Sequence, residues 1–186
     1  MARYFLALLP PESVQEEVLA IQKIFAMEYQ SRKALNAPPH ITLQAPFEWP
    51  PASSTTIASI DAVVQALYRW ADQHQSIPIQ LSGFGAFAPR VIYIKVQLTP
   101  ELLDLHSQLQ TYCAQAWLIQ DNRAQSRSFV PHMTVAFRDL KRASFYAAWP
   151  FFQDRQFDHP FVATDITLLK HNGQRWEIFD QAAFGN

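Results

Sequence analysis

The hydrophobic pattern of the chain predicts a mixture of strands and amphipathic helices. Apolar residues spaced by three and four predict helices over residues 13–29, 53–74, 100–118 and 139–149, with Ser53 or Ser54 capping the second helix. An apolar run at 4–9, which Pro10 ends, predicts the first strand. Alternating or β-branched runs predict further strands at 40–43, 77–87, 91–98, 132–137, 166–169 and 176–179. We expect Pro46 to close the strand at 40–43.

The connections between the predicted strands favour antiparallel pairing. Residues 88–90 form a short link between two strong strands, and Asn172-Gly173 is typical of a closing hairpin. Strands joined by short links indicate an α+β fold rather than a doubly wound parallel sheet. No break in composition marks a linker, so residues 1–186 are expected to form a single domain.

Composition narrows the class of protein. Apolar residues make up 49% of the chain and charged residues 17%, which excludes disorder as its main state. A net charge of −1 argues against binding along a nucleic acid duplex, yet a small anionic ligand needs only a few residues. The single cysteine, Cys113, excludes an intramolecular disulfide framework and cysteine-based zinc clusters.

The absence of targeting and membrane signals points to a cytoplasmic protein. Pro10 and Pro11 interrupt the N-terminal apolar run before it reaches the length of a signal peptide. No segment approaches the roughly 18 apolar residues of a membrane span. The lack of a long exposed apolar pattern favours a monomer.

One local pattern occurs twice, about half a chain apart. Residues 38–43 read Pro-Pro-His-Ile-Thr-Leu, and residues 130–135 read Val-Pro-His-Met-Thr-Val. Side chains two apart in a strand share a face, so His40 lies beside Thr42 and His132 beside Thr134. The repetition predicts two similar lobes related by a pseudo-two-fold axis, with both motif strands lining one central cleft.

Two histidines and two threonines in one cleft suit phosphoryl chemistry. A neutral imidazole can take a proton from an attacking water while a protonated one donates to a leaving oxygen. Threonine hydroxyls can donate hydrogen bonds to phosphoryl oxygens. The histidine spacings do not resemble a metal site, so we expect neither a metal nor another cofactor.

The tetrads HITL at His40 and HMTV at His132 resemble the doubled signature of the 2H phosphoesterase superfamily. Within it, the chain is similar to the bacterial 2′-5′ RNA ligase group, also described as RNA 2′,3′-cyclic phosphodiesterases. The resemblance implies a bilobal α+β fold in which two antiparallel sheets line a cleft, with helices outside. It also implies metal-independent opening of 2′,3′-cyclic phosphates on RNA ends or small nucleotides to 2′-phosphates, with weak 2′-5′ ligation. The family's catalytic quartet carries over to His40, Thr42, His132 and Thr134.

Four further residues are candidate substrate contacts. Five aromatic residues could stack on a base, and core packing is the better explanation for most of them: Phe47, Trp49, Phe84, Phe87 and Phe137. Phe47 and Phe137, which follow the two motifs, are the chosen candidates. Arg90 could bind phosphate or cap a sheet edge, and Arg138 directly follows Phe137. Arg123 and Arg127 are interpreted as residues of a solvated loop.

Two other functions would use the same cleft without turnover. A binding module would recognise phosphorylated RNA ends or nucleotides and form no product. An interaction protein with a vestigial cleft would not be stabilised by a nucleotide 2′-phosphate, whereas a ligand at 100 times its Kd stabilises by about 2.7 kcal/mol.

Overall fold

The computed structural model describes residues 2–50, 59–119 and 128–185. In these residues the order of elements is β1 (Ala2–Leu8), α1 (Glu12–Glu28), a 3₁₀ turn η1 (Lys33–Asn36), β2 (Ile41–Trp49), α2 (Ile60–Ala71), β3 (Ile77–Phe87), β4 (Val91–Val96), α3 (Pro100–Ala116), β5 (His132–Ala136), α4 (Arg142–Phe152), β6 (Asp158–Ala163), β7 (Asp165–His171) and β8 (Trp176–Ala183).

Two four-stranded antiparallel sheets organise the fold, which confirms the predicted α+β class. Sheet A has the strand order β2-β1-β7-β8, and sheet B has the order β5-β4-β3-β6. Each motif strand, β2 or β5, is an edge strand and pairs with the strand that precedes it in the chain, β1 or β4. The two sheets therefore place their motifs at equivalent positions, as the predicted pseudo-two-fold relation requires.

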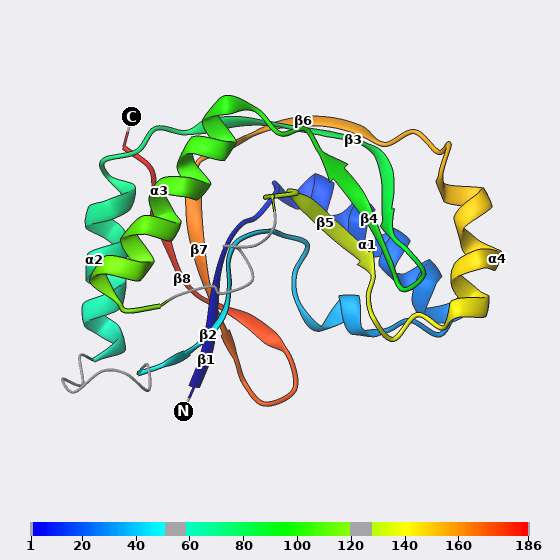
Figure 1. Cartoon of the computed structure of the whole chain (residues 1–186), viewed down its shortest axis with the longest axis horizontal. Helices are drawn as coiled ribbons and strands as arrows, with labels where there is room; N and C mark the ends of the chain where they lie inside the picture. Colours follow the sequence, from blue (N-terminus) through cyan, green and yellow to red (C-terminus); the bar gives the residue numbers. More distant parts are fainter. Residues whose placement is uncertain (1, 51–58, 120–127, 186) are drawn as a thin grey trace.

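The helices lie on the outside of the two sheets (Figure 1). Helices α2 and α3 lie together at the sheet A end of the molecule, and α4 lies at the opposite end. Helix α1 precedes the first motif but contacts β5, and α3 precedes the second motif but contacts β2. Each half of the chain thus supplies a helix to the motif strand of the other half.

Side-chain amides reinforce this exchange of helices. On α1, Gln22 Nε2 donates to the carbonyl of Thr134 at 2.9 Å, and on α3, Gln110 Nε2 donates to the carbonyl of Leu43 at 2.7 Å. An edge strand has backbone groups without a ladder partner on one side, and a buried carbonyl needs a donor. The two glutamines supply such donors to both motif strands.

Besides a small cluster of Phe5, Ala7 and Leu169, the core is one large cluster with members from both sheets and all four of the described helices. The alternation of strand residues explains its composition, because every second side chain of a strand points inward. Its fully buried members include Leu6, Leu8, Ile41, Leu43, Ile92, Ile94, Met133 and Val135.

The predictions for two strands that contain a proline were wrong. Strand β2 does not end at Pro46 but continues to Trp49, and β6, which contains Pro160, was not predicted at all. Both are edge strands. A proline is tolerated there because one side of the strand has no hydrogen-bonded neighbour.

The remaining helix and hairpin predictions hold with shifted ends. The described part of α2 begins at Ile60, where Ser59 Oγ accepts from the amide of Ala62 at 3.3 Å. Ser53, Ser54, Arg123 and Arg127 lie outside the described residues. The β3–β4 and β7–β8 hairpins form as predicted. Within the described ranges, no helix is both long enough and apolar enough to span a bilayer.

Candidate active site

The structure brings the two motif strands into contact. His40 directly precedes β2 and His132 begins β5, and these two strands touch each other between the sheets. The histidines and threonines of both motifs are half-buried, whereas the apolar residues between them are buried in the core. The predicted alternation, polar to one face and apolar to the other, is therefore present in both strands.

Both motif histidines are held in the same orientation by their own backbone. His40 Nδ1 lies 2.7 Å from the carbonyl oxygen of Pro38, and His132 Nδ1 lies 2.7 Å from that of Val130. A carbonyl oxygen only accepts, so each Nδ1 carries the hydrogen. In the neutral imidazole, Nε2 is then the unprotonated nitrogen, which can take a proton from a reacting group.

Burial favours the neutral form of both imidazoles by lowering their pKa values. Desolvation lowers the pKa of His40 to about 4; its bond to the Pro38 carbonyl opposes this shift, and the charge of His132 adds to it. Desolvation also lowers the pKa of His132 below its usual value, against the opposing bond to Val130. A positive charge on His132 therefore disfavours protonation of His40.

Aromatic rings pack against each histidine. The ring centroid of Phe5, on β1, lies 4.8 Å from that of His40. On sheet B, the rings of Phe87 and Tyr93 each lie 5.1 Å from that of His132. These contacts restrict both imidazoles to narrow ranges of orientation.

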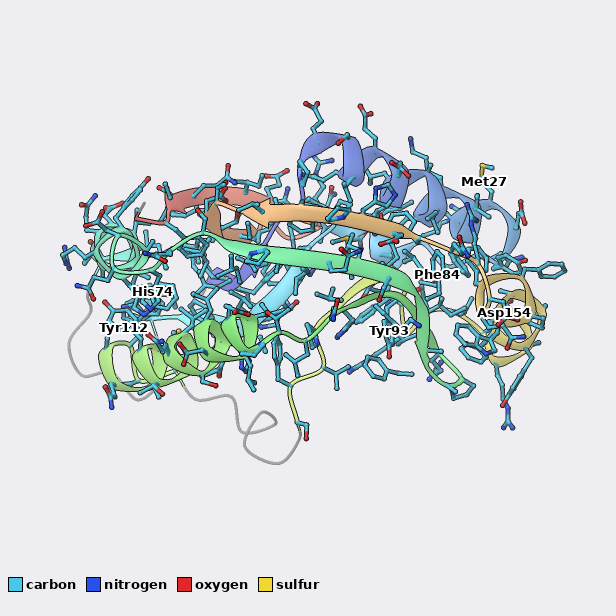
Figure 2. All side chains as sticks on the ribbon, turned by 90° about the horizontal axis from the view of Figure 1, so that it is seen from above. Met27, His74, Phe84, Tyr93, Tyr112 and Asp154 are labelled. Atoms are coloured by element: carbon cyan, nitrogen blue, oxygen red, sulfur yellow. The ribbon has the colours of Figure 1, made fainter. Side chains whose placement is uncertain are left out.

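The site uses the faces of the sheets that point away from the main core. Phe84, a member of the core, lies on the face of sheet B that carries α1, and Tyr93 lies on the opposite face (Figure 2). Tyr93 is the register partner of Thr134, and Lys95 that of His132. Directly paired residues of an antiparallel ladder share a face. Tyr93 and Lys95 therefore belong to the site face of sheet B.

The predicted substrate contacts fall in different places. Phe47 is only 8% exposed and packs in the core, its ring 6.2 Å from that of Tyr4, so the structure does not bring it to the histidines. Like Ile41 and Leu43 it is buried in the core, although the β1–β2 pairing shifts register between Thr42 and Phe47. Arg90 is exposed at the tip of the β3–β4 hairpin.

Phe137 and Arg138 are exposed just beyond the end of β5. The guanidinium carbon of Arg138 lies 5.6 Å from the ring centroid of Phe137. The contacts found for the described residues do not join this pair to either motif histidine. Their role in substrate binding stays a prediction.

Sequence reasoning missed the neighbours of His132. Phe87 was not among the predicted substrate contacts but is 43% exposed beside the imidazole. Tyr93 and Lys95 sit in a strand that was predicted correctly, yet only the pairing of β4 with β5 shows which of its faces carries the site. A strand pairing between distant segments leaves no local signal in a single sequence.

Asp139 connects the end of the second motif strand to the segment leading into the first. Its carboxylate accepts from Ser31 Oγ at 3.0 Å and from the amides of Arg32 and Lys33 at 2.7 and 3.0 Å. Ser31 is fully buried, and its hydroxyl oxygen accepts from the amide of Phe137 at 3.3 Å. This network fixes the two motif segments relative to each other.

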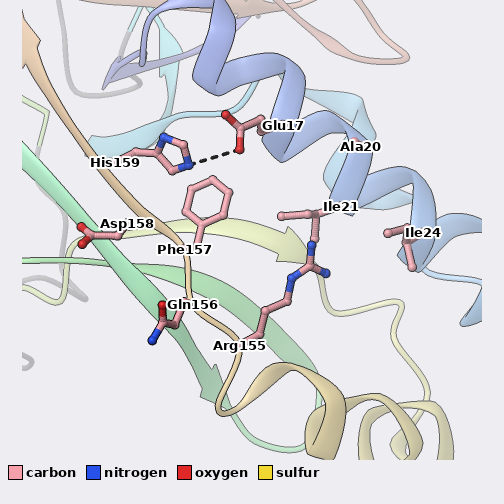
Figure 3. A pocket seen from close by; sticks show the side chains of 9 residues that line it. All are labelled: Glu17, Ala20, Ile21, Ile24, Arg155, Gln156, Phe157, Asp158 and His159. Atoms are coloured by element: carbon pink, nitrogen blue, oxygen red, sulfur yellow. Dashed lines mark ion pairs between the residues drawn. The ribbon is translucent and has the colours of Figure 1, made fainter.

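A pocket of about 400 Å³ lies elsewhere, between α1 and the segment that enters β6 (Figure 3). Across it, His159 Nε2 lies 3.1 Å from Glu17 Oε2. Strand β6 is at the edge of sheet B farthest from β5. The pocket also lies on the α1 side of the sheet, whereas Tyr93 and His132 lie on the other. It is therefore separate from the histidine pair.

The donor sets of the described residues do not form a metal site. No group of three or more His, Cys, Asp or Glu is placed to hold an ion within residues 2–50, 59–119 and 128–185. Metal independence itself remains a prediction for experiment.

Comparison with known proteins agrees with the geometry. A sequence profile described as the 2′-5′ RNA ligase superfamily matches residues 10–175. A predicted phosphoesterase of Bacillus cytotoxicus is 32% identical over 133 residues, which are 70% of this chain and 67% of that protein. Another, from Oceanobacillus iheyensis, is 28% identical over 98% of both chains. The crystal structure of Escherichia coli LigT complexed with 3′-AMP has the same fold, with a TM-score of 0.64 at 19% identity over 100% of this chain and 99% of LigT.

Proposed function

The chain belongs to the 2′-5′ RNA ligase superfamily of 2H phosphoesterases, and we propose that it opens 2′,3′-cyclic phosphates on RNA ends or small nucleotides to 2′-phosphates, with weak 2′-5′ ligation as the reverse type of reaction. One observation carries the proposal. Two His-x-Thr strands meet between two sheets, and each histidine has its Nδ1 engaged by backbone and its Nε2 left for chemistry.

The two imidazoles would act as a base and an acid on opposite sides of the phosphorus. The neutral Nε2 of one takes a proton from water as the water oxygen bonds to phosphorus. The bond from phosphorus to the 3′ oxygen breaks, and the protonated Nε2 of the other histidine gives its proton to that oxygen. Atoms and charge balance with no further reactant, and exchange with solvent restores both protonation states.

Thr42 and Thr134 would stabilise the charge that builds on the phosphoryl group. Each lies two residues after its histidine on the same strand face, so their hydroxyls point to the same space as the imidazoles. Donors aimed at developing charge stabilise the transition state more than the ground state. Escherichia coli LigT has been crystallised with 3′-AMP, ATP and phosphate, which supports a nucleotide or its phosphate as the ligand class here.

The direct test is turnover in EDTA. The protein is incubated with a 2′,3′-cyclic nucleotide and with an RNA that ends in this group, and products are separated by chromatography. We expect a 2′-phosphate from both substrates at rates that EDTA does not change. A folded protein that binds a nucleotide 2′-phosphate but never forms product would instead be the binding module.

The pKa shifts predict an acidic optimum for kcat/KM. The reaction needs one neutral and one protonated imidazole, so its two limbs follow the two histidine pKa values. Because the pKa of His40 is lowered to about 4 and that of His132 is also lowered from 6.5, the acid limb should fall near pH 4 and the alkaline limb below pH 6.5. Initial rates between pH 3 and 9 measure both limbs. A flat profile, or a maximum above pH 7, contradicts the assignment of the pair.

A further inference from the structure

The surroundings of the two catalytic histidines differ although their motifs are equivalent. On sheet A, Thr42 pairs with Ala7, and His40 packs on Phe5, which is 3% exposed. On sheet B, Thr134 pairs with Tyr93 and His132 pairs with a lysine, Lys95. The His40 side is thus small and apolar, whereas the His132 side carries an exposed cation and accessible aromatic surface.

We propose that the nucleoside of the substrate binds on the sheet B side of the histidine pair, with its base against Phe87 and its phosphate oxygens near Lys95. The inference rests on the proposed function and goes beyond it, because it states which lobe binds the base and which residues contact the base and the phosphate.

Phe87 has the properties of a stacking surface. Its ring lies 4.6 Å from that of Tyr93 and 5.1 Å from that of His132, so it is held in place on one side. With 43% of the residue exposed, the other side remains open to a ligand. Gly85 allows this arrangement, because a Cβ at this position would lie 2.5 Å from the Tyr93 ring. Every base offers a face on which such a ring can stack.

Lys95 supplies the positive charge. It is exposed on the same face as His132, and its side chain passes over Gly83, where a Cβ would lie 3.7 Å from Nζ. Among the described residues, the ion pairs found are His159–Glu17 and Arg175–Glu177, so no carboxylate neutralises this ammonium there. A cyclic phosphate is an anion, and an uncompensated lysine beside the acid–base pair attracts it.

The aromatic residues on the His40 side are a weaker platform. Trp176 packs on Phe5 with centroids 4.7 Å apart, but His171 lies against its ring and the guanidinium of Arg3 lies 5.7 Å from its centroid. Arg3 is in turn bonded to His171, with 3.1 Å between their nitrogens. These contacts cover part of Trp176, which is half-buried and less exposed than Phe87.

The experiment compares two substrates that differ only in the base. Steady-state kinetics are measured on adenosine 2′,3′-cyclic phosphate and on ribose 2′,3′-cyclic phosphate. Phe87→Ala should raise KM about 10-fold more for the adenosine substrate than for the base-free substrate. Any fall in kcat from the looser packing around His132 should be the same for both substrates. Lys95→Met should raise KM for both substrates. Phe151→Ala, which removes a phenylalanine 74% exposed on α4, and Lys23→Met on α1 are the matched controls.

Three results would overturn the placement of the base or the phosphate. They are an unchanged KM in Phe87→Ala, an equal rise of KM for both substrates in this variant, and a rise of KM in Trp176→Ala that is confined to the adenosine substrate. Failure of the proposed function is distinguishable, because wild type would then turn over neither substrate. In that event, calorimetric titration with 2′-AMP decides: about 10-fold weaker binding by Phe87→Ala supports the site, and equal or absent binding refutes it.

Discussion

Replacing either His40 or His132 by alanine is expected to lower kcat/KM on a 2′,3′-cyclic nucleotide by at least ~10²-fold. A positioned acid or base contributes on this scale, and the fixed Nδ1 of each ring leaves one nitrogen for proton transfer. The double variant should be little worse than either single one, because residues that act as a unit are not additive. Rates are measured in EDTA at the optimum pH.

His159→Ala is the matched control for both substitutions. His159 is also a half-buried histidine of sheet B, but its partner is Glu17 in the separate pocket. It should keep wild-type kcat/KM and, since both members of the ion pair are partly exposed, lose less than about 1 kcal/mol of unfolding free energy. Equal losses of activity in all three variants, or melting temperatures lowered in step with activity, would indicate a structural role for the motif histidines.

Asp139→Ala is expected to lower the free energy of unfolding by about 2–3 kcal/mol. Its carboxylate accepts three hydrogen bonds from the segment before the first motif. Their loss leaves the hydroxyl of buried Ser31 without its acceptor. Asp139→Asn should recover only part of this, because one oxygen cannot serve the hydroxyl and both amides. Denaturant unfolding followed by circular dichroism gives the values.

Asp154→Ala provides the comparison for the carboxylate. Asp154 is exposed just after α4, and its removal should change stability by less than about 0.5 kcal/mol. If Asp139→Ala and Asp154→Ala are equally stable, the Asp139 network contributes nothing measurable. If Asp139→Ala is also less active, the network helps to place the two motifs relative to each other.

Sequence reasoning succeeded where the physical signal is local. The repeated His-x-Thr pattern identified the strands that the structure brings together, because alternation along a strand is visible in six consecutive residues. The helices at 13–29 and 100–118 followed from apolar spacing alone, and α1 and α3 match them closely.

It failed where the outcome depends on which strands become neighbours. Pro46 and Pro160 are tolerated because β2 and β6 are edge strands. No local sequence pattern indicates that a strand will lie at the edge of its sheet. Phe47 and Phe87 both lie near the end of a strand, yet the pairing of β2 with β1 places the first against Tyr4 in the core, whereas the β3–β4 hairpin leaves the second beside His132. The site face of β4 likewise depends on its pairing with β5.

The exchange of helices between the halves has a consequence for synthesis of the protein. Helix α1 leaves the ribosome early, but the carbonyl of Thr134 that Gln22 meets lies 112 residues later in the chain. The apolar surface of α1 that will contact β5 therefore stays uncovered while most of the polypeptide is made. Such long-range contacts slow folding and expose nascent chains to aggregation. The N-terminal half therefore cannot complete its native packing until β5, which ends at Ala136, has been synthesised.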